Sequence, residues 1–332
     1  MLATGTAMIG GALPASAASA PSGTVNLVAY SVPSPAYAVQ IKAFNKTKQG
    51  KNVTFSQSYG PSGSQAKAIV AGQPADVVNF ASATDMETLL AANLVAPNWA
   101  FDPTTKGMVT DSVVVLVVPK GNPDHVKTWA DLSKPGVRIF TPNPFSSGSA
   151  RWNIMAAYGA ELKLGKSTAQ AQSYLGQLLK NTVVQSSSAA NELQAFLADE
   201  GSNKSDVFLD YESDAIQAIH AGTQISYVVP KQTILIENPI AVTTDAKNPT
   251  AAKAFVNYLL SAPAQKEWAK LGYRPVLPSV AAATKKSFPQ PAQLFTIASF
   301  GGWDQVNNEF FSTSSSSPGI VTKIESNLGQ TT

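Results

Sequence analysis

Short apolar runs alternate along the chain with amphipathic, helix-like stretches. Val25–Tyr30 is short and largely apolar, a pattern typical of a strand buried on both faces. A helix-like stretch around Ala38–Asn45 separates it from a second strand at Val53–Gln57, and another helix precedes a third strand at Asp76–Phe80. This β-α-β-α-β rhythm predicts a parallel, doubly wound sheet.

A second set of elements follows a long β-branched run. Asp111–Pro119 is a candidate crossover strand, and Pro239–Thr243 is a candidate return strand. Between them we expect the strands Gly136–Thr141, Asp206–Tyr211 and Ile225–Val229 and the helices Thr128–Leu132, Ala150–Leu164 and Ser213–Ala221. Two more helices are expected at Ala251–Ser261 and Ala264–Leu271.

The predicted fold is therefore α/β, with two doubly wound lobes joined by two crossover strands. Residues 24–110 plus 240–332 are expected to form lobe 1, and residues 111–239 lobe 2. The Ser-rich tail beyond Ser312 is expected to fray.

Composition narrows the class of protein. A chain of 332 residues with 44% hydrophobic content is long enough for two buried cores. The net charge of +3 is spread without a basic stripe, which argues against nucleic acid as a partner. The chain has no cysteine, which excludes disulfides, thiolate metal sites, cysteine nucleophiles and a lipidated N-terminal cysteine.

Residues 1–20 have the pattern of a signal peptide. Leu2–Leu13 is apolar and uncharged, and two small-x-small sites follow it, which predicts cleavage after Ala17 or Ala20. No Lys or Arg precedes the apolar run. No other stretch approaches the roughly 18 apolar residues of a membrane-spanning helix. We expect an exported, soluble protein.

Three loops that lead from strands into helices are rich in serine and glycine. They are Tyr59–Gln65, Pro142–Ser149 and Gln185–Ser188. The first N–H groups of a helix lack internal acceptors, and the helix dipole places about half a positive charge at that end. Serine is also an ordinary N-cap, so one such loop alone indicates only capping. Three of them indicate an anion site that needs no Lys or Arg.

The three loops contain no Asp or Glu. A site made only of donors suits an anion that has no proton to donate, because the proton of hydrogen phosphate would be buried without an acceptor. The loops therefore favour sulfate, thiosulfate or molybdate over phosphate.

At these loops the sequence resembles a known family. The matching segments are Gln57–Ala66, Val117–Pro123, Lys134–Val137, Thr141–Pro144, Ser146–Asn153, Tyr211–Ala215, Tyr273–Pro275 and Gly301–Trp303. They resemble the sulfate- and thiosulfate-binding proteins that serve bacterial ABC importers. The resemblance implies a periplasmic, monomeric, non-enzymatic protein of type II periplasmic-binding-protein architecture. It also implies no cofactor and no metal, and delivery of the anion to a membrane permease and ATPase.

The resemblance also implies a set of ligand-binding residues. These are the Ser62 hydroxyl, the backbone N–H groups of Ser31, Ser147, Gly148, Ser149 and Ser188, and the side chain of Tyr211. The family usually has Trp at the position of Tyr211, so molybdate or tungstate stays open as the ligand. Arg151 is expected to support the second loop through a carboxylate partner rather than to contact the anion.

Two other classes of function stay open. A hydrolase or lyase on the same scaffold would need a base beside a serine. However, the only histidines, His125 and His220, are expected on the surface, and no Gly-x-Ser-x-Gly elbow is present. A surface interaction protein with a vestigial cleft would bind no oxyanion.

Overall fold

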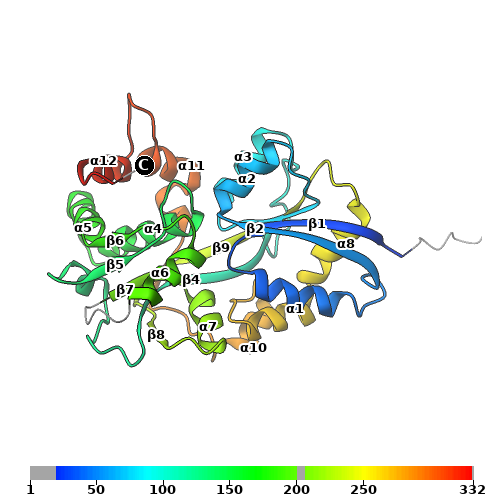
Figure 1. Cartoon of the computed structure of the whole chain (residues 1–332), viewed down its shortest axis with the longest axis horizontal. Coiled ribbons are helices and arrows are strands. Elements are labelled where there is room, and N and C mark those ends of the chain that lie inside the picture. Colours follow the sequence, from blue (N-terminus) through cyan, green and yellow to red (C-terminus); the bar gives the residue numbers. More distant parts are fainter. Residues whose placement is uncertain (1–19, 200–205, 331–332) are drawn as a thin grey trace, which may run out of the picture.

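The computed structural model describes residues 20–199 and 206–330. The expected signal peptide lies outside these residues, apart from Ala20. In the described part the strands form one sheet, in the order β2-β1-β3-β9-β4-β7-β5-β6, with β8 beside β4 and β10 beside β9. Helices cover both faces at each end of this sheet (Figure 1). The expected α/β architecture is confirmed.

The strands are β1 Ser22–Tyr30, β2 Asn52–Gly60, β3 Val77–Asn79, β4 Met108–Pro119, β5 Arg138–Phe140, β6 Thr182–Val184, β7 Asp206–Tyr211, β8 Ile225–Val228, β9 Gln232–Val242 and β10 Gln293–Phe295. The helices are α1 Ser34–Phe44, α2 Ser62–Val70, α3 Ala83–Ala91, α4 Gly148–Lys163, α5 Thr168–Lys180, α6 Ala189–Asp199, α7 Glu212–His220, α8 Pro249–Leu259, α9 Ala262–Lys270, α10 Pro278–Thr284, α11 Gly302–Val306 and α12 Ile320–Asn327. Short turns of helix lie at η1 Trp129–Ser133, η3 Ile297–Phe300 and η4 Asn307–Phe311.

The first lobe is built on β1, which pairs in parallel with β2 and β3. Successive side chains of a strand point to opposite faces. Val25, Leu27 and Ala29 accordingly pack into a core with α1, α8 and α9, while Val28 packs into a second core with α2 and α3. These helices lie on the two sides of β1 and β2 in Figure 1. The apolar run is therefore explained by burial on both faces.

The second lobe repeats this arrangement around β5, β6 and β7, which run parallel to one another. Val114 and Leu116 of the neighbouring β4 belong to the core under α4 and α5. Val113, Val115 and Val117 belong to the core with α6 and α7. Trp152 of α4 is fully buried and packs in the same core as Val114 and Leu116.

Both crossover strands are longer than the sequence indicates. The first part of β4 pairs with β9, from Met108 to Val113, and its second part pairs with β7 and β8. In the same way β9 leaves β4 at Pro239 and pairs with β3 from Ile240 onward. The two strands thus run side by side between the lobes, where a hinge would have to lie.

The C-terminal segment from β10 onward packs against α4 and α5. Trp303 makes an edge-to-face contact with Trp152, and Phe310 does the same with Tyr158. We propose the expected two-lobe division with one change, in which residues 240–284 belong to lobe 1 and residues 293–327 to lobe 2. Figure 1 shows α11 and α12 beside the second lobe.

The expectation of a frayed tail beyond Ser312 is wrong. The tail forms α12, and Val321 is fully buried in the large core of the second lobe. The serines of this segment form a short loop that precedes the helix, and apolar Ile320, Val321 and Ile324 supply its packing face. Among the described residues, no helix combines the length and the apolar composition needed to cross a bilayer.

Candidate functional site

The carboxyl ends of the parallel strands in both lobes meet at the centre of the molecule. β1 ends at Tyr30, β3 at Asn79, β5 at Phe140 and β7 at Tyr211. Ligands of doubly wound sheets bind beyond these ends, where helices begin. The start of α2 comes from the first lobe, and the starts of α4 and α6 come from the second. The topology alone therefore places several helix N-termini around one point.

A small pocket lies at this point. Its lining includes Ser31, Ser62, Ser147, Ser149 and Ser188, five of the seven residues that we expect to bind the ligand. The remaining lining residues are Tyr30, Val32, Pro61, Ala81, Ala189 and Asp214. No Lys or Arg is among these described lining residues. The pocket is thus lined largely by hydroxyls and by amides at helix starts.

The start of α4 is held by Asn143. Its carbonyl accepts from the Ser147 amide at 2.9 Å, and its side chain accepts from the Phe145 amide at 2.8 Å. The Ser147 and Ser149 hydroxyls are 2.8 Å apart and hydrogen-bonded. Because the Ser147 amide already has an acceptor, the helix offers Gly148 and Ser149 as its free first-turn donors. The Ser147 amide, which the resemblance implies as a donor to the ligand, is thus already engaged, whereas Ser147 itself is in the pocket lining.

Gly148 lies outside the pocket lining, at a close approach of the two lobes. A Cβ on this residue would lie 3.1 Å from the Ala81 Cβ and 3.4 Å from Asp85 Oδ2. Both neighbours belong to the first lobe, so glycine is required here for close approach rather than for backbone conformation.

Ser62 begins α2 and is buried, with only 2% of its surface exposed. Its hydroxyl oxygen accepts from the Ala81 amide at 3.0 Å and donates to Asp85 Oδ2 at 2.5 Å. Ser188 has a capping role at the start of α6, where its hydroxyl accepts from the Asn191 amide at 3.3 Å. Ser31 lies half-buried in the loop between β1 and α1.

Tyr211 is fully buried behind the pocket rather than in its lining. Its hydroxyl donates to the Ala81 carbonyl at 3.3 Å. The same carbonyl accepts from Trp152 Nε1 at 2.8 Å and from Asn238 Nδ2 at 3.3 Å. Because Ala81 is in the first lobe and Tyr211 and Trp152 are in the second, these bonds hold the lobes together in this structure.

Arg151 does not have the carboxylate partner that the sequence predicts. Its Nε donates to the Pro144 carbonyl at 2.8 Å, and its Nη1 donates to Asn307 Oδ1 at 2.8 Å. The guanidinium also lies over the ring of Phe311, with 5.1 Å between its central carbon and the ring centroid. Burial lowers the pKa of Arg151, and the charge of Asp85 opposes this shift. The residue supports the loop through neutral acceptors.

The sequence analysis missed two acidic side chains at this site. Asp214 is in the pocket lining, and Asp85 lies outside it and accepts the hydrogen bond of Ser62. Burial raises the pKa of Asp85 to about 6. The hydrogen bond from Ser62 and the charge of Arg151 act in the opposite direction and lower this pKa. Burial also raises the pKa of Asp214 to about 7, whereas hydrogen bonds with Ser213 and Asp210 lower it. The expectation that the site contains no acidic residue is correct for the three loops. It is wrong for the rest of the pocket lining, which includes Asp214. The acids come from α3 and α7, and no local pattern marks them.

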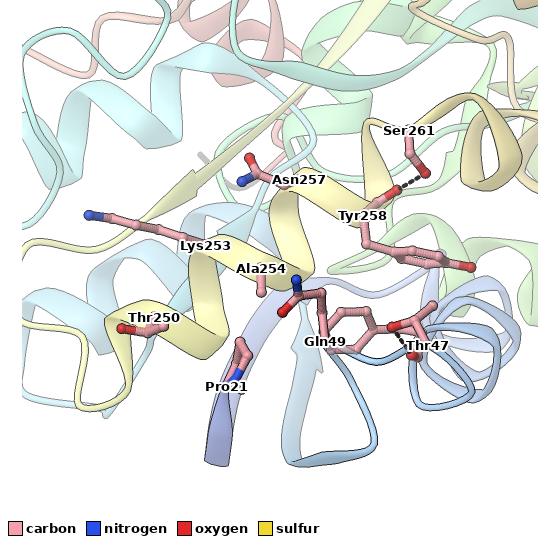
Figure 2. Close-up of a pocket in the computed structure, with 10 residues that line it drawn as sticks. Pro21, Thr47, Gln49, Thr250, Lys253, Ala254, Asn257, Tyr258 and Ser261 are labelled. Atoms are coloured by element: carbon pink, nitrogen blue, oxygen red, sulfur yellow. Dashed lines mark hydrogen bonds between the residues drawn. The ribbon is translucent and has the colours of Figure 1, made fainter. Parts of the chain in front are cut away.

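The structure has other hollows outside the central pocket. Figure 2 shows a hollow on the first lobe between α8, β1 and the loop after α1, with Lys253 extending away from Gln49 and Tyr258. The Ser261 hydroxyl in this hollow donates to the Tyr258 carbonyl at 2.6 Å, a local bond that ends α8. Within the described residues no group of three or more His, Asp or Glu is arranged to hold a metal ion. His125 and His220 are exposed, as expected.

Comparison with known proteins agrees with this geometry. The family model described as bacterial extracellular solute-binding protein matches residues 25–274. A sulfate-binding protein of Synechococcus elongatus is 40% identical over 295 residues, which cover 86% of this chain and 83% of that protein. A thiosulfate-binding protein of Escherichia coli is 33% identical over 277 residues, 81% of each chain.

Among solved structures, the sulfate-binding protein SubI from Mycobacterium tuberculosis H37Rv superposes with a TM-score of 0.83. It is 40% identical in sequence, and the match covers 87% of this chain and 99% of that one. The fold, the central pocket and these matches agree, and the chain belongs to the bacterial extracellular solute-binding proteins.

Proposed function

We propose that this protein binds sulfate between its two lobes, outside the cytoplasmic membrane, and presents it to an ABC-type importer. The observation that carries the proposal is the pocket itself. Buried hydroxyls and helix N-termini from both lobes surround a small volume, and its lining includes no Lys or Arg. Amides and hydroxyls that are fixed in this way stabilise an anion without a formal countercharge.

The relatives support the choice of ligand, since several of them are named for sulfate and others for thiosulfate. In the proposed complex the Ser147 hydroxyl and the amides of Gly148 and Ser149 donate to the anion. The Ser62 hydroxyl, which donates to Asp85 in this structure, would turn from Asp85 to the anion when the anion binds. The Ser31 loop and the start of α6 at Ser188 supply further amides. Tyr211 acts through the lobe contact at Ala81.

Binding would couple to lobe closure. An anion that contacts donors of both lobes stabilises the closed form and not the open one, so it shifts the population toward closure. The motion would occur at β4 and β9, the two strands that connect the lobes. We propose that the closed form is what the importer recognises, and that the protein acts in the periplasm.

A hydrolase is not favoured. The relatives are named for binding, and the group next to the Ser62 hydroxyl is the Asp85 carboxyl rather than a histidine. Hydrolysis of a sulfate ester would need a base that is free to take the serine proton. Asp85 is instead held between Ser62 and the charge of Arg151.

Calorimetric titration tests the proposal. Sulfate, thiosulfate, molybdate, tungstate and phosphate are titrated separately into the full-length mature protein at pH 6. We expect sulfate or thiosulfate to bind most tightly with one site per chain, and the bound anion to raise the melting temperature by mass action. If none of these anions gives heat or shifts the melting temperature, the proposal is wrong.

A further inference from the structure

The Ser62 hydroxyl lies between the anion pocket and a buried carboxyl. Ser62 lines the pocket, yet in this structure its hydroxyl donates to Asp85 Oδ2 at 2.5 Å. The hydroxyl oxygen accepts from the Ala81 amide at 3.0 Å. A hydroxyl has one proton to donate and two lone pairs that can accept. As long as Asp85 accepts that proton, the Ser62 hydroxyl has nothing left to donate to an anion in the pocket.

Asp85 itself is outside the pocket lining. It lies in the first turn of α3, with only 7% of its surface exposed. Its carboxyl belongs to the lining of a second small pocket, which it shares with Gly148 and Arg151 of the other lobe. Because the Ser62 side chain separates Asp85 from the anion pocket, Asp85 acts on a bound anion through this hydroxyl and through its own charge.

An ionised Asp85 would be left without a donor if Ser62 turned to the anion. The charged and titratable groups around it are Arg151 on α4, the exposed Lys67 on α2 and the buried Tyr211 on β7. The guanidinium of Arg151 donates to Pro144 and Asn307 instead of Asp85. A buried carboxylate that loses its hydrogen bond beside a dianion is costly. Ionised Asp85 therefore competes with the anion for the Ser62 hydroxyl.

A proton on Asp85 removes the competition. The contact between the two side chains can then run in the opposite direction, with the Asp85 carboxyl donating to Ser62 Oγ. Ser62 would accept from Asp85 and from the Ala81 amide and donate to the anion, so that its one proton and both lone pairs are used. This exchange moves protons and leaves the heavy atoms in place.

We propose that protonation of Asp85 reverses its hydrogen bond with Ser62 and frees the Ser62 hydroxyl for the anion, so that Asp85 sets the affinity for sulfate without touching it. The inference rests on the proposed function and makes Asp85 a positioning residue that acts through Ser62. No covalent bond other than the O–H bond of the carboxyl is formed. The proton comes from the buffer when sulfate binds and returns to it when sulfate leaves.

Asp85→Asn tests the proposal in a calorimetric titration with sulfate at pH 5 and pH 8. The asparagine amide can donate to Ser62 Oγ at either pH, as the protonated carboxyl would. Burial raises the pKa of Asp85 to about 6, so the wild-type carboxyl is mostly protonated at pH 5 and ionised at pH 8. Asp85→Asn should bind sulfate about tenfold more tightly than the wild type at pH 8, with about a hundredfold as the ceiling. At pH 5 the two proteins should bind alike.

Two further variants locate the effect. In a Ser62→Ala background the gain from Asp85→Asn should fall below about twofold, because the hydroxyl that it frees is absent. Asp304→Asn removes a carboxyl from the first turn of α11, where it is exposed, and should leave the Kd of the wild type unchanged at both pH values. An Asp85→Asn protein that binds no more tightly than the wild type at pH 8 would overturn the proposal. An equal gain with and without Ser62 would overturn it too, since Asp85 would then act by charge repulsion alone.

The wild type and Ser62→Ala test the inference even if Asp85→Asn does not fold. The ratio of the Ser62→Ala Kd to the wild-type Kd should fall several-fold from pH 5 to pH 8, as Asp85 ionises and withdraws the hydroxyl. Asp214 is present in both proteins, so its own ionisation cancels in this ratio. A ratio that stays constant would overturn the role of Asp85 and leave sulfate binding intact. Absence of sulfate binding by the wild type at both pH values, in a protein that melts cooperatively, would instead overturn the proposed function.

Discussion

Gly148 gives the most direct test of lobe closure. An added Cβ there would lie 3.1 Å from the Ala81 Cβ, 3.4 Å from Asp85 Oδ2 and 3.6 Å from the Ser82 hydroxyl, and all three belong to the opposite lobe. Gly148→Ala should therefore leave each lobe intact and penalise only their approach. Overpacking of a close contact costs about 1–3 kcal/mol. If closure and binding are coupled, the sulfate Kd should rise by about 5- to 150-fold.

The assay is a sulfate titration by calorimetry, with thermal melting in the absence of sulfate. The melting temperature should equal or exceed that of the wild type, because alanine favours the helix more than glycine does. Gly176→Ala is the matched control, since a Cβ at this position inside α5 meets no atom within 4 Å. It should melt higher and bind sulfate as the wild type does. A Gly148→Ala variant with a Kd within twofold of the wild type would refute the closed geometry as the binding state.

Three further predictions follow from single side chains. Ser62→Ala should weaken sulfate binding by about 1–3 kcal/mol, because a buried charged acceptor loses a donor; an unchanged Kd in a titration would remove Ser62 from the site. Tyr211→Phe should raise the Kd by about two- to tenfold through loss of one cross-lobe hydrogen bond, with the sulfate-to-molybdate ratio unchanged; a changed ratio would show that the hydroxyl touches the anion. Burial and the charge of Glu237 raise the pKa of Asp111 to about 8. The folded state therefore holds this proton to higher pH than the unfolded state, and stability falls as pH rises from about 4 to 8. In urea denaturation, Asp111→Asn should lose less stability than the wild type between pH 5 and 9; an equal loss would contradict the assignment.

Much of the fold could be predicted because its signals are local. The apolar run of β1 and the β-branched run of β4 indicate buried strands without reference to any other part of the chain. The return strand, β9, could be predicted only in part from its sequence. β9 begins at Gln232, but polar Glu237 and Asn238 followed by Pro239 interrupt its apolar pattern, so only its last residues could be recognised.

The C-terminal segment shows what local patterns miss. Nothing within residues 293–327 says which lobe they join. The contacts of Trp303 with Trp152 and of Phe310 with Tyr158 are the basis on which we assign the segment to the second lobe, and each joins residues about 150 positions apart. The Ser-rich loop before α12 suggested fraying because its own residues bury little, whereas Val321 beyond it anchors the helix.

The candidate site likewise combines residues that a local sequence pattern predicts with residues that only the fold brings to the pocket. Ser62 and Ser188 lie in loops that carry a local signal, serine at the start of a helix, whereas Ser31 was expected only from the family resemblance. Asp85 and Asp214 carry none, since each is an ordinary acidic residue in the first turn of a helix. Only the fold brings them to the pocket, and their burial then changes the chemistry that a set of neutral donors would have.

The measurement that tests the central claim most directly is a crystal structure of the protein with sulfate bound. The account predicts the anion in the pocket between Ser62, Ser149 and Ser188, in hydrogen-bond contact with hydroxyls and amides of both lobes and with no Lys or Arg among its contacts. A sulfate held by the guanidinium of Arg151, or bound in the hollow of the first lobe while the central pocket stays vacant, would contradict it.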